Sequence, residues 1–139
     1  MIAPASLFRR LAAGIYDLFI IFALLLFATS LALCLNQGQS LKPYAFSFSL
    51  FLISCVIFFY TWFWTHGGQT LGMQAWRIQV VNQKTLEALT WPMAINRFIF
   101  ALLNISFFGL GYLCSFFNPH KLSAHDFISK TRVIYISPN

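Results

Sequence analysis

The sequence predicts an all-α integral membrane protein with two full transmembrane helices, a broken or re-entrant third helical segment and a small two-stranded cytoplasmic element. Of its 139 residues, 59% are hydrophobic and only 9% are charged, whereas about a quarter of a soluble domain is charged. Three long apolar stretches cover about residues 11–35, 44–65 and 92–117. Polar segments separate them, and because 139 residues are the size of one domain, we expect a single membrane domain over residues 1–139.

The first apolar stretch, Leu11–Leu35, is long enough to cross a bilayer. A helix rises about 1.5 Å per residue and needs roughly 20 residues to span the hydrocarbon. Asp17 is the one formal charge in this stretch. An ionised carboxylate in hydrocarbon costs a few kcal/mol unless a partner stabilises it. Arg10 and Gly14 lie on the same helix face as Asp17, at i, i+4 and i+7 spacing.

The second stretch, Tyr44–Thr65, contains no formal charge and ends in the aromatic group Tyr60–Trp64. Such aromatic groups anchor a helix at the level of the lipid head groups. The loop over 66–91 is long enough to have a structure of its own. Within it, residues 76–82 alternate and are rich in β-branched side chains, as a strand is. A lone strand is unstable, so we expect it to pair with the similar run 131–136.

This pairing requires both strands to lie on one side of the membrane, and the basic residues agree. Cytoplasmic segments carry the excess of Lys and Arg. If the third apolar stretch crosses fully, five of the nine basic residues are cytoplasmic; if it enters and returns, eight are, with Lys42 outside. The second arrangement is therefore favoured, with the N-terminus and C-terminus in the cytoplasm.

The third apolar stretch also has the composition of a broken segment. Pro92–Leu103 and Phe107–Phe117, at about 16–18 Å each as helices, are too short to cross roughly 30 Å of hydrocarbon. Asn104, Ser106, Gly109 and Gly111 supply the break between them. The alternative is one continuous, tilted helix over the whole stretch.

Arg97 is the one charged residue of the third stretch, and it lies at a depth comparable with that of Asp17. Arg97, Ala101 and Asn104 repeat the i, i+4, i+7 spacing of the first helix. We therefore expect a buried ion pair between Asp17 and Arg97. This pair is either a structural clamp between helices or a carboxylate that exchanges its arginine for a proton or cation during transport.

Several other functions are not expected. The sequence contains no nucleotide-binding loop, nucleophile motif or paired catalytic carboxylates, so neither an enzyme nor a cofactor is predicted. Basic residues at the edges of apolar stretches suit lipid head groups better than nucleic acid. His120 and His125 are five residues apart, which is poor spacing for a shared metal site on a helix. No metal site is predicted.

Three motif-like stretches follow one another along most of the chain. Arg10–Asp17 places an arginine before a mid-helix aspartate, with Arg9 as the alternative arginine. Gly68–Val81 contains Gly-Gln-Thr-Leu-Gly before the predicted strand, and Asn118–Val133 contains His-Asp and then Thr-Arg-Val. In this order and spacing they resemble the RDD family of bacterial membrane proteins, although Met73 stands where that family often has a basic residue. The resemblance implies a multi-pass protein of the bacterial inner membrane that transports an unidentified ligand.

The charge pattern and the resemblance together select the candidate site residues. Those of the intramembrane charge group are Arg10, Asp17, Arg97 and Asn104. Those of the middle loop and the C-terminal tail (118–139) are Gly68, Thr70, Gly72, Arg77, His125, Asp126 and Thr131.

We therefore expect a small transporter-like protein that moves an unidentified ligand in a proton- or cation-linked manner, with Asp17 carrying the charge. The alternative is a non-transporting accessory or assembly subunit of a larger membrane complex. A third possibility is lipid head-group binding by the basic rim of Arg77, Lys84, Lys121, Lys130 and Arg132. Three short helical segments hardly enclose a polar path alone, so a homo-oligomer or a larger membrane-protein partner is expected.

Overall fold

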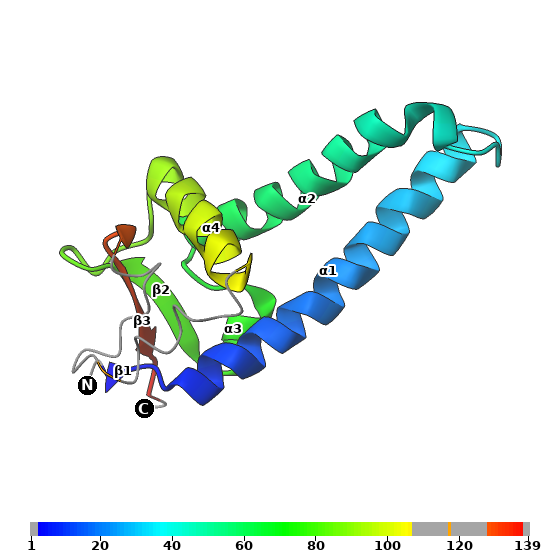
Figure 1. The fold of residues 1–139 in the computed structure, drawn as a ribbon. Coiled ribbons are helices and arrows are strands. Elements are labelled where there is room, and N and C mark those ends of the chain that lie inside the picture. Colours follow the sequence, from blue (N-terminus) through cyan, green and yellow to red (C-terminus); the bar gives the residue numbers. More distant parts are fainter. Residues whose placement is uncertain (1–2, 107–116, 118–127, 138–139) are drawn as a thin grey trace.

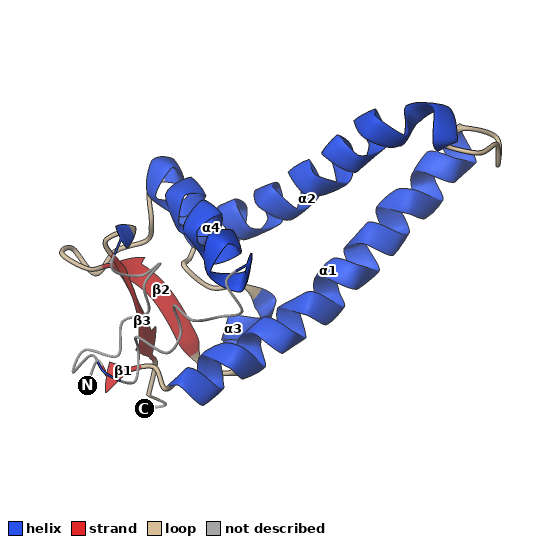
Figure 2. Ribbon diagram, in the orientation of Figure 1, coloured by secondary structure: helices blue, strands red, loops and turns tan. Residues whose placement is uncertain are grey.

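The structure, a computed structural model, describes residues 3–106, 117 and 128–137. Two long helices, α1 and α2, form an antiparallel hairpin that extends from a compact end containing the other helices and a sheet (Figure 1). Figure 2 shows that the strands gather at this end, near both termini. In chain order the elements are β1 (Ala3–Pro4), α1 (Leu7–Leu35), the 3-10 helix η1 (Lys42–Tyr44), α2 (Ala45–Thr65), α3 (Leu71–Ala75), β2 (Ile78–Asn82), α4 (Trp91–Ser106) and β3 (Thr131–Tyr135).

The helices α1 and α2 are both long and apolar enough to cross a membrane, as the sequence predicts. Helix α1 begins four residues earlier than expected, because the Ser6 side chain caps it by accepting a hydrogen bond from the backbone N–H of Arg9. The turn after α1 places Gln37 and Gly38 at positive φ. This tight turn sends the chain back along α1 as α2.

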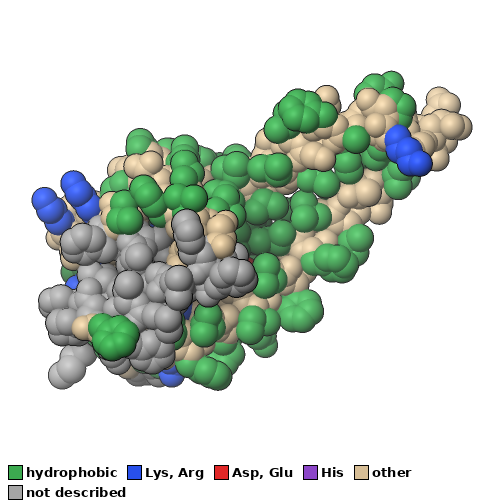
Figure 3. Space-filling model, viewed as in Figure 1, with side chains coloured by type: hydrophobic (Ala, Val, Ile, Leu, Met, Phe, Trp, Pro, Cys, Tyr) green, Lys and Arg blue, Asp and Glu red, His purple; other side chains and the backbone are tan. Residues whose placement is uncertain are grey.

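Most apolar side chains of the hairpin are exposed. Phe22 of α1 is 64% exposed and Phe46 of α2 is 78% exposed. In Figure 3, hydrophobic side chains cover the hairpin, while Lys and Arg side chains lie toward the two ends of the molecule. A helix that is apolar on most sides and unburied by its own chain is suited to lipid or to a partner helix.

The sheet confirms the expected pairing and enlarges it. Strands β2 and β3 are antiparallel, with Val80 opposite Val133, and the strand order is β1-β3-β2. The prediction of two strands is wrong because the N-terminal β1 adds a third, with Ala3 opposite Tyr135. A two-residue strand contains no alternation, so its pattern is not visible in the sequence. Strand β2 also begins later than residue 76, because Arg77 adopts φ 54° after α3.

The third apolar stretch contains a helix that is longer than its expected first half. Helix α4 continues through Asn104 to Ser106, so the prediction of a break at Asn104 is wrong. Its 16 residues correspond to about 24 Å, still short of the roughly 30 Å of hydrocarbon. Gly109 and Gly111 lie outside the described residues, so the predicted break there stays a prediction.

The core lies at the compact end, where the sheet meets α4 and the adjoining ends of α1 and α2. Its members are alanines, branched aliphatic residues and two aromatics, and together they fill the space between the helices and the sheet. They are Ala5, Ala13, Trp64, Ile78, Val80, Leu89, Ala94, Phe98 and Val133. This core holds the start of α1 and the end of α2 against the sheet.

The hydrogen-bonded order β1-β3-β2 requires the N-terminal strand, the middle loop and the C-terminal strand to lie on one side of a membrane. In a variant whose three native cysteines are serines, we expect cysteines at exposed Lys84 and Ile136 to react with a membrane-impermeant maleimide from the same side. A cysteine at Ser40, in the turn of the hairpin, should react from the opposite side. Labelling of Lys84→Cys and Ile136→Cys from different sides of sealed vesicles would contradict this arrangement.

Candidate functional site

Asp17 is the most buried ionisable side chain of the described residues, at 1% exposure. It lies on the face of α1 that also carries Arg10, Ala13 and Ile21. The backbone N–H of Gly72 donates a 2.9 Å hydrogen bond to Oδ1, and the hydroxyl of Thr70 donates to Oδ2. Both carboxylate oxygens are therefore satisfied by neutral groups of the middle loop.

The start of the short helix α3 supplies both hydrogen-bond donors to the Asp17 carboxylate. Thr70 is its N-cap, and the Thr70 hydroxyl oxygen accepts a 3.3 Å hydrogen bond from the backbone N–H of Met73. A Cβ added at Gly72 would lie 2.3 Å from the carbonyl oxygen of Ala13 and 2.8 Å from Asp17 Oδ1. Only glycine permits this approach, so α3 and α1 meet at Gly72 and Ala13.

Gly68 shapes the loop before α3. It has φ +69°, and its backbone bridges two elements: its N–H donates to the carbonyl of Phe63, and its carbonyl accepts from Val80. A Cβ at Gly68 would lie 2.2 Å from the carbonyl oxygen of Val80. The two glycines selected from the sequence, Gly68 and Gly72, thus allow close backbone approaches on either side of Thr70.

Arg97 of α4 is 3% exposed and reaches the sheet rather than Asp17. Its Nη1 donates a 2.6 Å hydrogen bond to the hydroxyl of Thr131, which is itself 2.8 Å from the hydroxyl of Ser129. The guanidinium carbon lies 5.2 Å from the centre of the Trp64 ring. Arg97 is thus held at the junction of α4, α2 and β3.

The expected ion pair between Asp17 and Arg97 is not formed, although both residues are described. The hypothesis considered only facing helices as the source of partners. In the folded chain, the hydroxyl and N–H groups of α3 reach the carboxylate first, and strand β3 supplies a hydroxyl to the arginine. The two charges are therefore stabilised separately, on opposite sides of one cavity.

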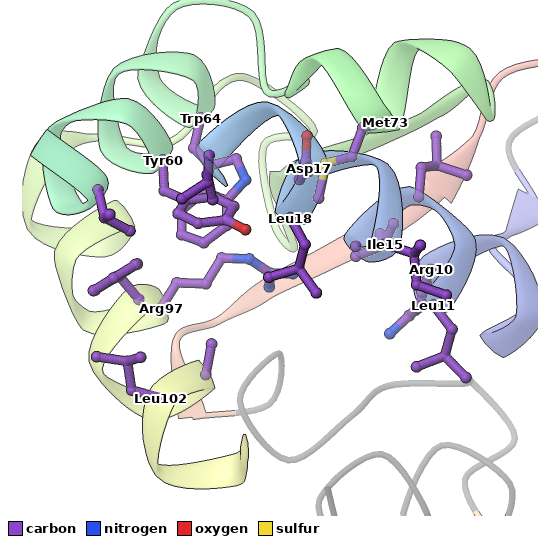
Figure 4. Close-up of a pocket in the computed structure, with 17 residues that line it drawn as sticks. Arg10, Leu11, Ile15, Asp17, Leu18, Tyr60, Trp64, Met73, Arg97 and Leu102 are labelled. Atoms are coloured by element: carbon purple, nitrogen blue, oxygen red, sulfur yellow. The ribbon is translucent and has the colours of Figure 1, made fainter. Parts of the chain in front are cut away.

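This cavity has a volume of about 420 Å³ and lies between α1, α2 and α4, with residues of α3 and the sheet completing its wall. Figure 4 shows Arg97 extending from α4 toward α1, with Tyr60 and Trp64 beside it and Leu18 opposite. Most of the wall is apolar, and its described ionisable residues other than Tyr60 are Arg10, Asp17 and Arg97. The remaining residues of the described wall are Leu11, Gly14, Ile15, Leu18, Ile21, Val56, Tyr60, Trp64, Met73, Ile78, Phe98, Ala101, Leu102 and Val133.

The two N-terminal arginines occupy different positions. Arg10 is buried and lines the cavity, which supports its selection over Arg9 as the arginine of the charge group. The guanidinium of Arg9 lies 4.3 Å from the centre of the Tyr135 ring and donates to the carbonyl of Trp76 at 3.4 Å. Arg9 therefore ties the start of α1 to the sheet and to the end of α3.

The other selected residues divide between the cavity region and the surface. Asn104 is buried on α4, one turn beyond Ala101, on the helix face that Arg97 shares. Arg77 is exposed, and its carbonyl pairs with Ile136 at the edge of the sheet, away from the cavity. His125 and Asp126 lie outside the described residues.

Sequence reasoning missed the part that the end of α2 plays in the site. Tyr60 and Trp64, interpreted there as interfacial anchors, both line the cavity. They are four residues apart and so share a helix face, which was the available signal. Ser129 was also missed, because a lone serine before a strand has no distinguishing pattern.

Comparison with known proteins finds one family. A model of the RDD family matches residues 4–130 of the chain. Neither the curated proteins nor the solved structures contain a significant match. The matched range includes Arg10, Asp17 and Arg97 of the cavity wall, together with Thr70, which donates a hydrogen bond to Asp17.

The contact of Gly72 with α1 generates a stability prediction. We expect Gly72→Ala to lower the free energy of unfolding by about 1–3 kcal/mol, because the added methyl group overpacks the contact with Ala13 and Asp17. Gly14→Ala is the matched control: its Cβ meets nothing within 4 Å, and alanine in a helix should stabilise by about 0.5–1 kcal/mol. Thermal unfolding in detergent micelles measures both. Equal midpoints for the two variants would contradict the close approach.

The hydrogen bond from Thr70 to Asp17 generates a second prediction. In a double-mutant cycle of Asp17→Asn and Thr70→Val, we expect a coupling free energy of about 1–3 kcal/mol, because each substitution removes one partner of a buried, charge-assisted hydrogen bond. Denaturant unfolding in micelles gives the four required values. Additive effects of the two substitutions would show that the carboxylate is not held by α3.

Proposed function

Since the family match covers most of its length, the chain belongs to the RDD family, and we propose that it is a small transporter-like membrane protein. Its ligand site is the cavity between α1, α2 and α4. The observation that carries this proposal is the presence of Arg10, Asp17 and Arg97 on the wall of one cavity, next to two helices of bilayer length. Buried ionisable groups near a membrane commonly mark ion or substrate pathways.

The hairpin indicates the depth of this cavity in a bilayer. Asp17 lies 18 residues before Leu35, which is about 27 Å from the turn of the hairpin and close to the thickness of the hydrocarbon. On α2, Trp62 lies 17 residues after Ala45 and belongs to the aromatic anchor. Asp17 is therefore proposed to lie near the head-group boundary, where α3 covers it, rather than deep in the hydrocarbon.

The sheet supports a returning third segment. Strand β2 precedes α4, β3 follows the third apolar stretch, and the two strands are hydrogen-bonded to each other. A single crossing between them would place β2 and β3 on opposite sides of a membrane. We infer that the third stretch enters and leaves on the side of the sheet. The excess of basic residues on this side supports the proposal that it faces the cytoplasm.

Helix α3 connects Asp17, the proposed cation site, to the wall of the cavity. The carboxyl group of Asp17 accepts two hydrogen bonds, from Thr70 and from Gly72 of α3, and Met73 of α3 is part of the cavity wall. A proton or metal cation bound at Asp17 competes with Thr70 and Gly72 for the carboxylate oxygens. In the proposed cycle, this competition loosens α3 and alters the wall where the ligand lies. A second copy or a larger membrane protein completes the path.

A specific observation favours the second function, a non-transporting accessory subunit. Both partners of Asp17 are fixed groups of the same chain, and they suit a carboxylate that anchors α3 permanently. In that case the exposed apolar sides of α1 and α2 dock on another membrane protein.

Reconstituted liposomes distinguish these functions. We expect the full chain to dissipate an imposed proton, Na⁺ or K⁺ gradient, and Asp17→Asn to reduce the rate to that of empty liposomes. Glu87→Gln, at an exposed carboxylate, is the control and should leave the rate unchanged. Folding of each variant is verified by its thermal midpoint. Absence of flux together with co-purification of one large membrane protein would establish the accessory role instead.

A further inference from the structure

The apolar part of the cavity wall indicates the kind of molecule that fills the cavity. We propose that one acyl chain of a membrane phospholipid enters the cavity from the bilayer and lies against α1, with its closest approach at Gly14. The inference rests on the proposed function for the cavity as the ligand site and for its depth in the membrane. It adds the chemical class of the occupant.

The free space beside Gly14 is the first observation. Gly14 lies within α1 and lines the cavity, and a Cβ added there would meet no described atom within 4 Å. Glycine inside a helix is less stable than alanine. At Gly72 a Cβ would lie 2.3 Å from the carbonyl oxygen of Ala13, so packing requires that glycine, but packing of the described residues does not require Gly14. The space at Gly14 instead allows another molecule to approach the backbone of α1.

The apolar composition of the wall is the second observation. Ile15, Leu18 and Ile21 of α1 line the cavity together with Phe98 and Leu102 of α4. Its volume of about 420 Å³ lies within the roughly 300–1,000 Å³ range of small-molecule sites. The walls of an empty apolar cavity lack dispersion contacts, and such cavities take up apolar molecules. A hydrocarbon chain supplies the missing contacts.

The charged residues of the described wall do not require a charged occupant. Asp17 accepts its two hydrogen bonds from the segment Thr70–Gly72, and Arg97 donates one to the Thr131 hydroxyl. Arg10 also interacts within the chain. Because the protein itself engages these three side chains, the occupant need not supply a counter-charge. An uncharged hydrocarbon segment is compatible with this wall.

The opening of the cavity identifies the source of the hydrocarbon. Ile15, Leu18 and Leu102 line the cavity and are also 55%, 63% and 49% exposed, so the cavity is continuous with the outer surface of the molecule. Ile21 lies 14 residues before Leu35, about 21 Å from the turn of the hairpin and thus within the roughly 30 Å of hydrocarbon. The medium at this opening therefore consists of lipid acyl chains. A phospholipid chain is the occupant that reaches the cavity most directly.

Photo-labelling of the full chain tests the inference. The lipid probe is a phosphatidylethanolamine in nanodiscs with a diazirine in the middle of one acyl chain. The free-hydrocarbon probe is an alkane with the same diazirine, added in neutral detergent. We expect the lipid probe to label Phe98, which lines the cavity, as well as Ile99, which is exposed on α4. Label on Phe98 reports a chain inside the cavity, whereas label on Ile99 reports the surrounding lipid.

Cavity-filling variants locate the chain. The side chain of Gly14→Leu enters the open space of the cavity. We expect the lipid label on Phe98 to fall about tenfold, because the leucine occupies the volume of the bound chain, and the label on Ile99 to stay unchanged. Ala23→Leu, at an exposed residue of α1 outside the described wall, is the matched control and should leave both labels unchanged. If the thermal midpoint shows that Gly14→Leu is unfolded, Ala101→Leu, which fills the cavity from α4, decides instead.

Three results would overturn the inference: no lipid label on Phe98 in the wild type, a label on Phe98 that persists in a folded Gly14→Leu protein, or labelling of Phe98 by the alkane alone. Failure of the inference is distinguishable from failure of the transport proposal. Cation flux without lipid label on Phe98 overturns the acyl chain alone. Lipid label on Phe98 that requires the space beside Gly14, without flux, supports the acyl chain and overturns transport.

Discussion

The carboxylate of Asp17 and the two groups that donate to it, the Thr70 hydroxyl and the Gly72 N–H, organise the compact end of the molecule. A buried carboxylate needs hydrogen bonds to remain ionised in a medium of low polarity. Helix α3 supplies them at the one point where glycine lets its backbone touch α1. Because α3 leads directly into β2, this contact also sets the position of the sheet against the hairpin.

The cavity follows from this arrangement. With Asp17 turned to α3, Arg97 is stabilised from another side, by the Thr131 hydroxyl and the face of the Trp64 ring. The two side chains remain apart, and the space between their helices is lined mainly by apolar residues. A direct ion pair would instead draw α1 and α4 together. Separate stabilisation of the two charges is thus compatible with an open cavity between α1 and α4.

Local sequence patterns were sufficient to predict those elements whose structure is determined by a single stretch of the chain. The lengths of the apolar stretches predicted α1 and α2, and the alternation of β-branched residues predicted that β2 pairs with β3. The i, i+4, i+7 spacing predicted that Arg10 and Asp17 share a helix face, and this face is buried in the structure. Such patterns did not predict β1, because a strand of two residues is too short to show alternation. They also did not predict the end of α4, which continues past Asn104, where a break was expected.

By itself, the sequence determined that two segments are of bilayer length and that Asp17 requires a partner, because hydrophobicity, charge and helical periodicity are properties of neighbouring residues. Only the tertiary structure decided which partner it has. The choice between Arg97 and the pair Thr70 and Gly72 depends on whether α4 or α3 comes within hydrogen-bonding distance of α1. That distance results from the packing of Gly72 on Ala13 and from the pairing of strands far apart in the chain, and neither is encoded in a local pattern.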